Sequence, residues 1–354
     1  MLANDVDQDR LRRLAELRPD GGATVICRYL DRDPQTYASP RALATEANSV
    51  LDEAARRVEE AGLDHDALAA ARADVERLRE ALLEVTPDED EVLDPDLDLK
   101  GARGLALFAC GPAGLFEVLK LPARVDTKVV VDSSPHITPL VQAGGGRERI
   151  VVAIVDRERS RIFHGTADTL EEIDRTEADR AHNKLRESDE LEHFKALSET
   201  LLGLLQDGRG FDLLVLAARD DVRGAVEDAL HPYVRERLAA DLSLDISSAS
   251  ADDVRRAASA LLEERRERHA GELLARLREG LGRGERAAAG LDDVREALEQ
   301  RRVEALIFEA TRELDRLDDL VDAAVLQDAE VISVDPDAHP ELGPHEGIGA
   351  VLRF

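Results

Sequence analysis

Residues 150–165 read IVVAIVDRERSRIFHG, and this stretch decides the fold of the middle of the chain. Residues 150–155 are an unbroken apolar, β-forming run, residues 156–159 are polar, and residues 161–165 return with an apolar pair. Two β-rich runs joined by a short polar turn predict a β-hairpin. The segment TLEEIDRTE that follows offers a third strand.

After this segment, the spacing of apolar residues changes from strand-like to helical. The helical positions are Leu191, Phe194, Leu197, Leu201, Leu204 and Leu205. The chain then reads FDLLVLAA as a buried strand, residues 220–229 as a helix and LSLDIS as a further strand. Because β and α segments alternate, we predict a layered α/β domain over residues 147–262.

The segment before the hairpin predicts an α+β domain over residues 1–146. Its expected strands are residues 24–31, 104–110, 115–121 and 128–134, and its expected helices are residues 40–61, 64–86 and 137–143. The acidic stretch TPDEDEVLDPDLDLK between them is expected to be a loop. We expect a flexible linker at Gly144, Gly145 and Gly146, because consecutive glycines have no side chains to pack.

A long helix over residues 251–280 is expected to lead into an α/β/α C-terminal domain, residues 263–354. The expected helices of this domain are residues 291–300 and 311–326, and its expected strands are residues 303–308, 330–334 and 350–354. The sequence therefore predicts an α/β protein of three domains, which fits a chain of 354 residues.

Composition narrows the class of protein. With 43% hydrophobic residues the chain can bury its cores, and no apolar run approaches the roughly 18 residues of a membrane span. The first 20 residues are charged throughout, so we expect a soluble, cytoplasmic protein. A net charge of -29 argues against a free-standing nucleic-acid binder, although a local patch can override the average. Cys27 and Cys110 lie in apolar runs and are expected to be buried.

Two groups of residues contain side chains that can bind metal ions, but neither has the full set of ligands of a known type of metal site. Asp94, Asp96 and Asp98 alternate in a loop that lacks the glycine and the later glutamate of a calcium loop. His339 and His345 flank PELGP, and no cysteine or third histidine lies nearby to complete a zinc site. We therefore expect no metal site and no cofactor.

The connecting helix and its exit are the clearest local excess of positive charge. Seven arginines are candidate RNA-binding residues: Arg255, Arg256, Arg265, Arg266, Arg268, Arg276 and Arg278. Guanidinium groups suit bidentate phosphate contacts, which favours a face directed at RNA. The alternative is a solvated helix in which arginines pair with acids three or four residues away.

The order of these segments resembles a known family. FDLLVLAARDDVRGAVEDAL, LSLDIS, the connecting helix, GLDDVREALEQRRVEALIFEA and the terminal GIGAVLRF resemble the second and third domains of the archaeo-eukaryotic peptide-chain release factor superfamily. The hairpin at residues 150–165 looks like the start of the middle domain of that family. The resemblance covers about residues 147–354 and is strongest to the bacterial and archaeal branch, which includes ribosome-rescue and hibernation relatives.

The resemblance also says where hydrolysis would occur. Members of the family that hydrolyse peptidyl-tRNA carry Gly-Gly-Gln in the loop before the long helix of the middle domain. The corresponding residues 175–189 read RTEADRAHNKLRESD, with neither glycine nor glutamine, and Gly-Gly-Gln occurs nowhere in the chain. His182, Asn183 and Lys184 are weak catalytic candidates. A polar loop in which Ser188 caps the next helix is the favoured alternative.

The resemblance implies a translation-associated, ribosome-binding protein without hydrolytic activity. Its implied partners are the ribosome or tRNA, with a translational GTPase as a further partner, and no membrane. We find no counterpart of the stop-codon motifs in the first domain. Two alternatives stay open: a divergent peptidyl-tRNA hydrolase or RNA-cleaving enzyme, and a protein-binding scaffold that makes no RNA contact.

Overall fold

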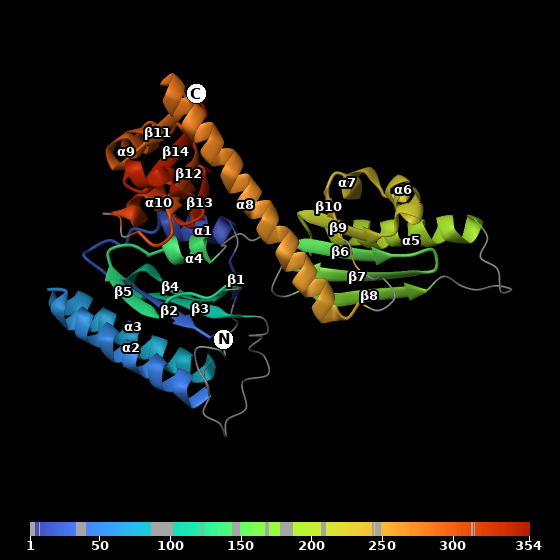
Figure 1. Ribbon diagram of the computed structural model, residues 1–354. Coiled ribbons are helices and arrows are strands. Elements are labelled where there is room, and N and C mark those ends of the chain that lie inside the picture. Colours follow the sequence, from blue (N-terminus) through green and yellow to red (C-terminus); the bar gives the residue numbers. More distant parts are fainter. Residues whose placement is uncertain are drawn as a thin grey trace. The chain divides into compact units, whose positions relative to one another are not determined.

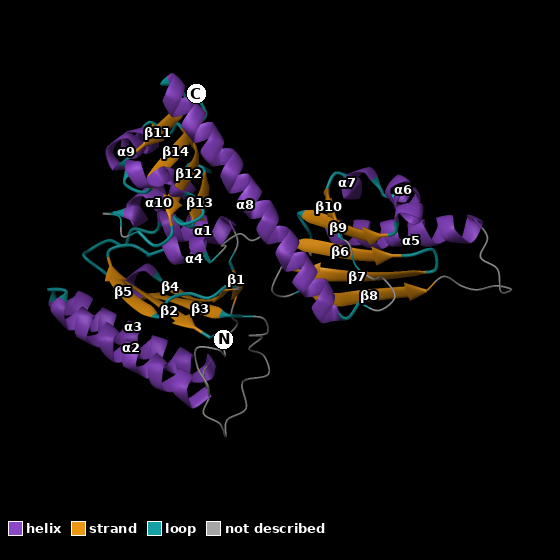
Figure 2. Cartoon of the chain, viewed as in Figure 1, coloured by secondary structure: helices purple, strands orange, loops and turns teal. Residues whose placement is uncertain are grey.

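The chain folds as a mixed α/β protein with several sheets (Figures 1 and 2). The computed structural model describes residues 4–6, 8–32, 40–85, 102–121, 123–143, 149–166, 170–177, 187–206, 210–242, 244, 249–312, 314 and 316–354. The chain divides into two compact units, one made of Met1–Gly146 with Arg268–Phe354 and the other of Arg147–Glu267. Within the described ranges, no helix has the length and apolar character needed to cross a membrane.

The N-terminal sheet has the strand order β1-β4-β3-β2-β5. Its strands are β1 (Asn4–Asp5), β2 (Val25–Asp31), β3 (Gly104–Cys110), β4 (Leu115–Leu121) and β5 (Lys128–Asp132). Neighbouring strands are antiparallel except β1 and β4. Alternate residues of β2 face opposite sides: Ile26 and Leu30 join one core cluster, while Cys27 and Tyr29 join another. Both faces are therefore covered, which explains why β2 and β3 are buried along their whole length.

Helices cover this sheet on its two faces, as Figure 1 shows. The pair α2 (Pro40–Glu60) and α3 (His65–Val85) packs on one face. Helices α1 (Gln8–Glu16) and α4 (Thr138–Gln142) pack on the other. The predicted helix pair and the predicted strands of this region are confirmed, whereas α1 was not expected from the sequence.

The C-terminal sheet has the order β11-β14-β12-β13. Its strands are β11 (Ala287–Ala289), β12 (Val303–Glu309), β13 (Glu330–Val334) and β14 (Ile348–Leu352). Helices α9 (Leu291–Glu299) and α10 (Leu317–Val325) pack on one face. The second half of α8 (Ala251–Arg283) packs on the other face.

The N-terminal and C-terminal segments share one apolar core. Leu11, Tyr29 and Phe108 belong to the same cluster of buried side chains as Phe308 and Val321. The first and third domains expected from the sequence thus lie in one compact unit, with the middle domain inserted between them in the chain. The three-domain boundaries at residues 146 and 262 remain a prediction.

The middle unit contains a five-stranded sheet of order β10-β9-β6-β7-β8. Its strands are β6 (Ile150–Val155), β7 (Arg159–Gly165), β8 (Glu171–Glu177), β9 (Leu213–Ala218) and β10 (Leu238–Asp241). The predicted hairpin is confirmed: β6 pairs antiparallel with β7, and β7 with β8. Asp156 holds the turn, because its Oδ1 accepts hydrogen bonds from the backbone N–H groups of Glu158 and Arg159 at 2.8 and 2.7 Å.

Helices also cover both faces of this second sheet. On one face Val151, Ala153 and Val155 pack against α5 (Glu187–Gln206) and α6 (Asp220–Ala229), beside the short α7 (Pro232–Arg235). On the other face the alternate residues of β6 pack against the first half of α8. The layered α/β architecture expected for this region is confirmed.

Two expected elements need correction, and a third lies mostly outside the described residues. Of the strand predicted at LSLDIS, residues 243 and 245–247 are not described; Leu242 is buried, and its backbone N–H donates to the Leu216 carbonyl at 3.0 Å, directly after β10. The helix predicted over residues 311–326 starts only at Leu317, after Arg316 in the left-handed conformation (φ 58°), and the last strand is Ile348–Leu352.

Candidate functional site

Helix α8 begins with a reciprocal cap. The Ser250 Oγ accepts a hydrogen bond from the Asp253 backbone N–H at 3.2 Å, and Asp253 Oδ2 accepts from the backbone N–H and the hydroxyl of Ser250 at 3.0 and 2.6 Å. The hydrogen bonds from Ser250, with the nearby Arg256, lower the pKa of Asp253 to about 2. The helix therefore starts at Ala251, as the sequence predicts.

The apolar face of α8 changes along the helix. Val254, Ala258 and Leu262 pack on the sheet of the middle unit. Ala270, Leu273, Leu274 and Leu277 pack on the C-terminal sheet. Residues 263–269, EERRERH, are all exposed. A helical stretch that is polar on every side is typical of a solvated connection between packed regions, so Arg265, Arg266 and Arg268 lie in solvent.

Several of the seven candidate arginines have acidic partners. Arg255 pairs with Asp252 at 2.6 Å, Arg256 with Asp253 at 2.5 Å and Arg266 with Glu263 at 3.6 Å, each three residues apart. Arg276 makes two hydrogen bonds to Glu304, at 2.9 and 2.8 Å, and Arg268 also has a partner. For Arg265 and Arg278, no ion pair occurs within the described part of the chain.

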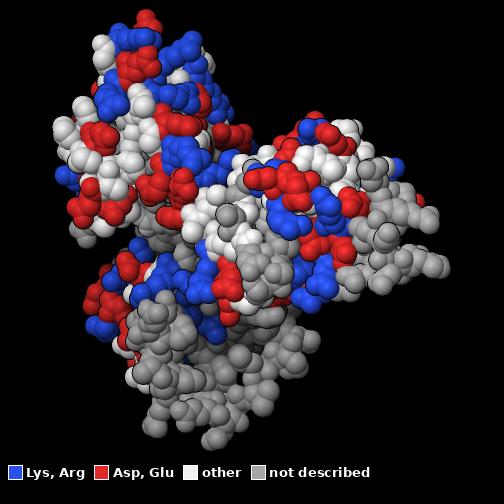
Figure 3. All heavy atoms as spheres, turned by 45° about the vertical axis from the view of Figure 1, so that its right-hand side comes forward, with Lys and Arg blue, Asp and Glu red and all other residues white. Residues whose placement is uncertain are grey.

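The candidate arginines do not form one basic face. At 3.6 residues per turn, their positions point around the circumference of the helix. On the face shown in Figure 3, Lys and Arg side chains lie interspersed with Asp and Glu. Four of the seven arginines thus form ion pairs, three of them local to the helix, and RNA contact by these residues stays a prediction.

A groove lies at the C-terminal end of α8, and of the residues that line it the sequence singled out only Arg276 as a site residue. It has a volume of about 200 Å³ and is lined by Arg276, Glu279, Gly280, Arg283, Glu285, Arg286, Val351 and Leu352. The paired Arg276, with Arg353 and Arg286 nearby, lowers the pKa of Glu304 beside it. The sequence signal for this groove is GLGRGER, in which glycines allow the chain to turn back against the helix.

The catalytic candidates cannot be placed in this geometry. His182, Asn183 and Lys184 lie outside the described residues, and so do the side chain of Ser188, the acidic loop with Asp94, Asp96 and Asp98, and the three linker glycines. Helix α5 begins at Glu187, so Ser188 lies in its first turn and not at the cap position that the sequence predicted.

The two histidines considered as metal ligands, His339 and His345, lie in the loop and short helix before the last strand. Among the described residues, no group of three or more His, Cys, Asp or Glu side chains is arranged to hold a metal ion. The backbone N–H of His339 donates to the Asp335 carbonyl at 2.9 Å, and His345 ends a short 3-10 helix, η2 (Pro340–His345).

Cys27 and Cys110 are buried free thiols, as expected, and burial raises the pKa of Cys27 to about 12. A thiol with that pKa is not a nucleophile at neutral pH.

Comparison with known proteins identifies the middle region. Residues 135–263 match the family described as bacterial archaeo-eukaryotic release factor family 10. This segment contains the whole sheet from β6 to β10 and the first part of α8. The chain is therefore release-factor-like over this segment. No curated protein matches the chain.

Several solved structures are similar to the chain. The archaeal translation termination factor aRF1 has 18% identity over 99% of both chains, with a TM-score of 0.28. Pelota from Archaeoglobus fulgidus has 20% identity over 71% of this chain and 79% of its own, with a TM-score of 0.36. Dom34 from S. cerevisiae, described as a translation termination-like factor that interacts with Hbs1, has 11% identity over 68% and 72%, with a TM-score of 0.43.

Proposed function

We propose that this chain is a ribosome-associated factor of the rescue, stress or hibernation type, because its residues 135–263 match the family described as bacterial archaeo-eukaryotic release factor family 10. The family match over the middle unit is the observation that carries the proposal. The ribosome or tRNA is the proposed partner, a translational GTPase is a further one, and the cytoplasm is the proposed location.

We propose further that the protein does not hydrolyse peptidyl-tRNA. The family resemblance assigns hydrolysis to a Gly-Gly-Gln loop, in which the glycines give the backbone its freedom. Residues 175–189 contain neither residue type, and Gly-Gly-Gln is absent from the whole sequence. A factor of this kind occupies its binding site on the ribosome without releasing the peptide.

The proposed RNA contact lies in the exposed stretch of α8 at residues 263–269. A protein with a net charge of -29 is repelled by phosphates at long range, and salt only screens that repulsion. Binding therefore has to come from guanidinium groups that reach phosphates directly. Arg265, Arg266 and Arg268 are exposed within two helical turns, which makes them the best placed of the candidates.

Charge reversal tests this contact. Changing Arg265, Arg266 and Arg268 to Glu should weaken co-sedimentation with ribosomes by about tenfold or more, because phosphate contacts dominate such affinities. The control reverses Arg56, Arg219 and Arg235, whose side chains are 70%, 64% and 53% exposed. Both triple variants make the same change in net charge.

The control avoids two arginines that hold the fold. Arg57 donates a hydrogen bond to the Val129 carbonyl at 2.9 Å, and the Arg77 guanidinium lies 4.0 Å from the centre of the Phe116 ring. Reversal of either charge would disturb the N-terminal core. Circular dichroism should show that both triple variants are folded. Equal ribosome binding by the two variants would refute the α8 contact.

Catalysis is tested separately from binding. The purified protein should leave peptidyl-tRNA intact under conditions in which a hydrolytic release factor cleaves it. If the protein cleaves the substrate and the change of His182, Asn183 and Lys184 to Ala abolishes cleavage, the hydrolase alternative is correct. If the protein neither cleaves nor binds ribosomes, the protein-binding scaffold is correct.

A further inference from the structure

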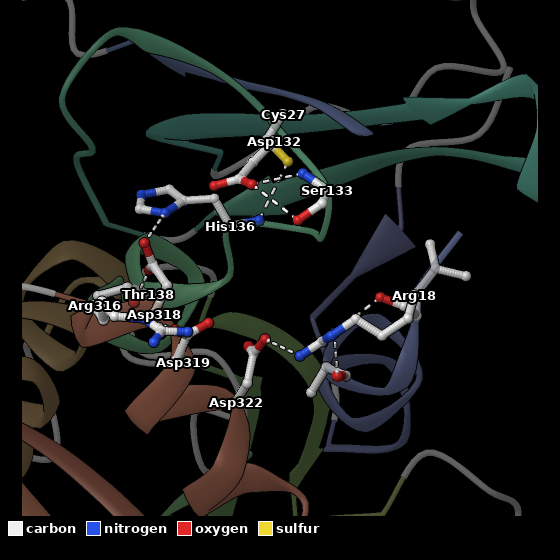
Figure 4. A network of polar contacts seen from close by, with 12 residues as sticks. Arg18, Cys27, Asp132, Ser133, His136, Thr138, Arg316, Asp318, Asp319 and Asp322 are labelled. Atoms are coloured by element: carbon white, nitrogen blue, oxygen red, sulfur yellow. Dashed lines mark hydrogen bonds and ion pairs between the residues drawn. The ribbon is translucent and has the colours of Figure 1, made fainter. Parts of the chain in front are cut away.

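A cluster of charged side chains lies where α10 meets the N-terminal segment, within one compact unit (Figure 4). Asp318, Asp319 and Asp322 stand on the first two turns of α10. Arg18, in the segment after α1, and His136, just before α4, approach them. The cluster thus links parts of the chain that are far apart in the sequence.

The buried Asp322 and the half-exposed Asp318 each have a partner from the N-terminal segment. The Arg18 Nη2 donates to Asp322 Oδ2 at 2.8 Å, while its Nη1 donates to the carbonyl groups of Ala15 and Leu17, both at 2.8 Å. The His136 Nδ1 lies 2.5 Å from Asp318 Oδ2. The Thr138 hydroxyl donates to the other oxygen of Asp318.

Asp322 is the least satisfied member of the cluster. The residue is only 2% exposed, and its Oδ1 is buried with no hydrogen-bond partner among the described residues. Its neighbours in the helix, Leu320, Val321 and Ala324, belong to the shared apolar core. A buried carboxylate with one unpaired oxygen is costly when ionised and much less so when it carries a proton.

The surrounding charges only partly offset this cost. Arg18 is the cation in contact with Asp322, whereas Asp318 and Asp319 repel its negative charge. Burial opposes ionisation of Asp318, but His136, Thr138 and Lys128 together outweigh burial and lower its pKa, so this neighbour stays negative. Asp319 pairs with Arg316 at 2.6 Å.

Several charged side chains on the other elements packed on α10 are paired elsewhere. On α1, Arg12 pairs with Asp328 and Glu16, and Arg10 and Arg13 pair with Glu117. On α9, Arg295 pairs with Asp292. On β12 and β13, Glu304 pairs with Arg276 and Glu330 with His269. Glu309, at the end of β12, pairs with Arg312. On β2, burial raises the pKa of the Cys27 thiol, and the negative charge of Asp322 adds to that rise.

We propose that Asp322 is a proton-binding site that couples the stability of this unit to pH near neutrality. As the pH falls, a proton from solvent binds the unpaired Oδ1, and the ion pair with Arg18 becomes a hydrogen bond from the guanidinium to a neutral acid. The repulsion from Asp318 and Asp319 ends at the same time. Acidification therefore tightens the packing of α10 against the N-terminal segment, whether or not the protein binds ribosomes.

The direction of the effect follows from the pKa of the group. Burial raises the pKa of Asp322 to about 7, Arg18 opposes the rise, and Asp318 and Asp319 add to it. The folded state therefore binds more protons than the unfolded chain between about pH 4 and 7. Stability falls as the pH rises through this window and levels off above it. One proton changes the folding equilibrium by at most about tenfold per pH unit.

The direct test is a titration of the full chain labelled with ¹³C at aspartate carboxyl groups. The Asp322 resonance, identified by its loss in Asp322→Asn, should titrate with a midpoint near neutral pH. The titration itself is read on the wild type, and a midpoint below about pH 5 would overturn the proposal.

Unfolding measurements provide the second reading. The Asp322→Asn variant, a neutral mimic of the protonated acid, should lose the pH dependence of unfolding assigned to this group, whereas Asp319→Asn on the exposed side of the same helix should keep it. An Asp322→Asn protein with the same pH slope as the wild type would contradict the proposal. Arg18→Met should raise the Asp322 midpoint further, and no change there would also count against it.

Discussion

Gly280, in the last turns of α8, allows the chain to return against the helix. A Cβ atom at this position would lie 2.6 Å from the Glu285 carbonyl oxygen and 2.7 Å from the Ala287 Cβ. Real Cβ contacts do not reach these distances, and the neighbours are main chain or directly attached to it. We therefore expect Gly280→Ala to force β11 away from the helix and to disturb the groove at its end.

The same helix supplies the matched control. Gly271 has nothing within 4 Å of its Cβ position, so Gly271→Ala should stabilise the helix by about 1 kcal/mol through propensity alone. Gly280→Ala makes the same gain in propensity but adds an overpacking cost of about 1–3 kcal/mol. Because propensity cancels, the difference between the two variants measures the close approach itself.

Thermal unfolding of the full chain measures both variants. For a unit of this size, each kcal/mol shifts the melting temperature by roughly 2–4 °C. Gly271→Ala should melt above the wild type, and Gly280→Ala should melt about 2–12 °C below Gly271→Ala. Equal melting temperatures for the two alanine variants would refute the packing described at the end of α8.

Two further predictions concern the middle unit. Hydrogen bonds from Arg161, with those of Arg175, hold the pKa of Glu172 at about 2, so this carboxylate stabilises the fold above about pH 4.5 and ceases to do so as the pH falls to 2. In Glu172→Gln, the free energy of unfolding should depend less on pH over that range. The same pH dependence as in the wild type would contradict the pairing. Phe163 is fully buried, so Phe163→Ala should cost about 3–5 kcal/mol in urea unfolding, and a loss under about 1 kcal/mol would contradict its place in the core.

The parts of this fold that sequence predicts are those with a local cause. The hairpin of β6 and β7 follows from an apolar run, a polar turn held by Asp156 and a second β-rich run. Helix α8, expected over residues 251–280, runs over Ala251–Arg283 and begins with the local cap of Ser250 and Asp253.

The parts that sequence misses depend on long-range contacts. Arg18 and Asp322 are 304 residues apart, and nothing near either residue signals their hydrogen bond. The burial that sets the state of Asp322 comes from an apolar core shared by the two ends of the chain. The same core explains why two regions with separate patterns form one compact unit.

Ribosome co-sedimentation of the wild-type protein across a range of salt concentrations tests the central claim most directly. If the protein is a ribosome-associated factor that contacts phosphates through exposed arginines, it should pellet with ribosomes at low salt. The logarithm of its affinity should fall linearly with the logarithm of the salt concentration, with a slope of about -0.7 to -0.9 per phosphate contact. Failure to pellet at any salt concentration would contradict the account, and binding that ignores salt would exclude the proposed phosphate contacts.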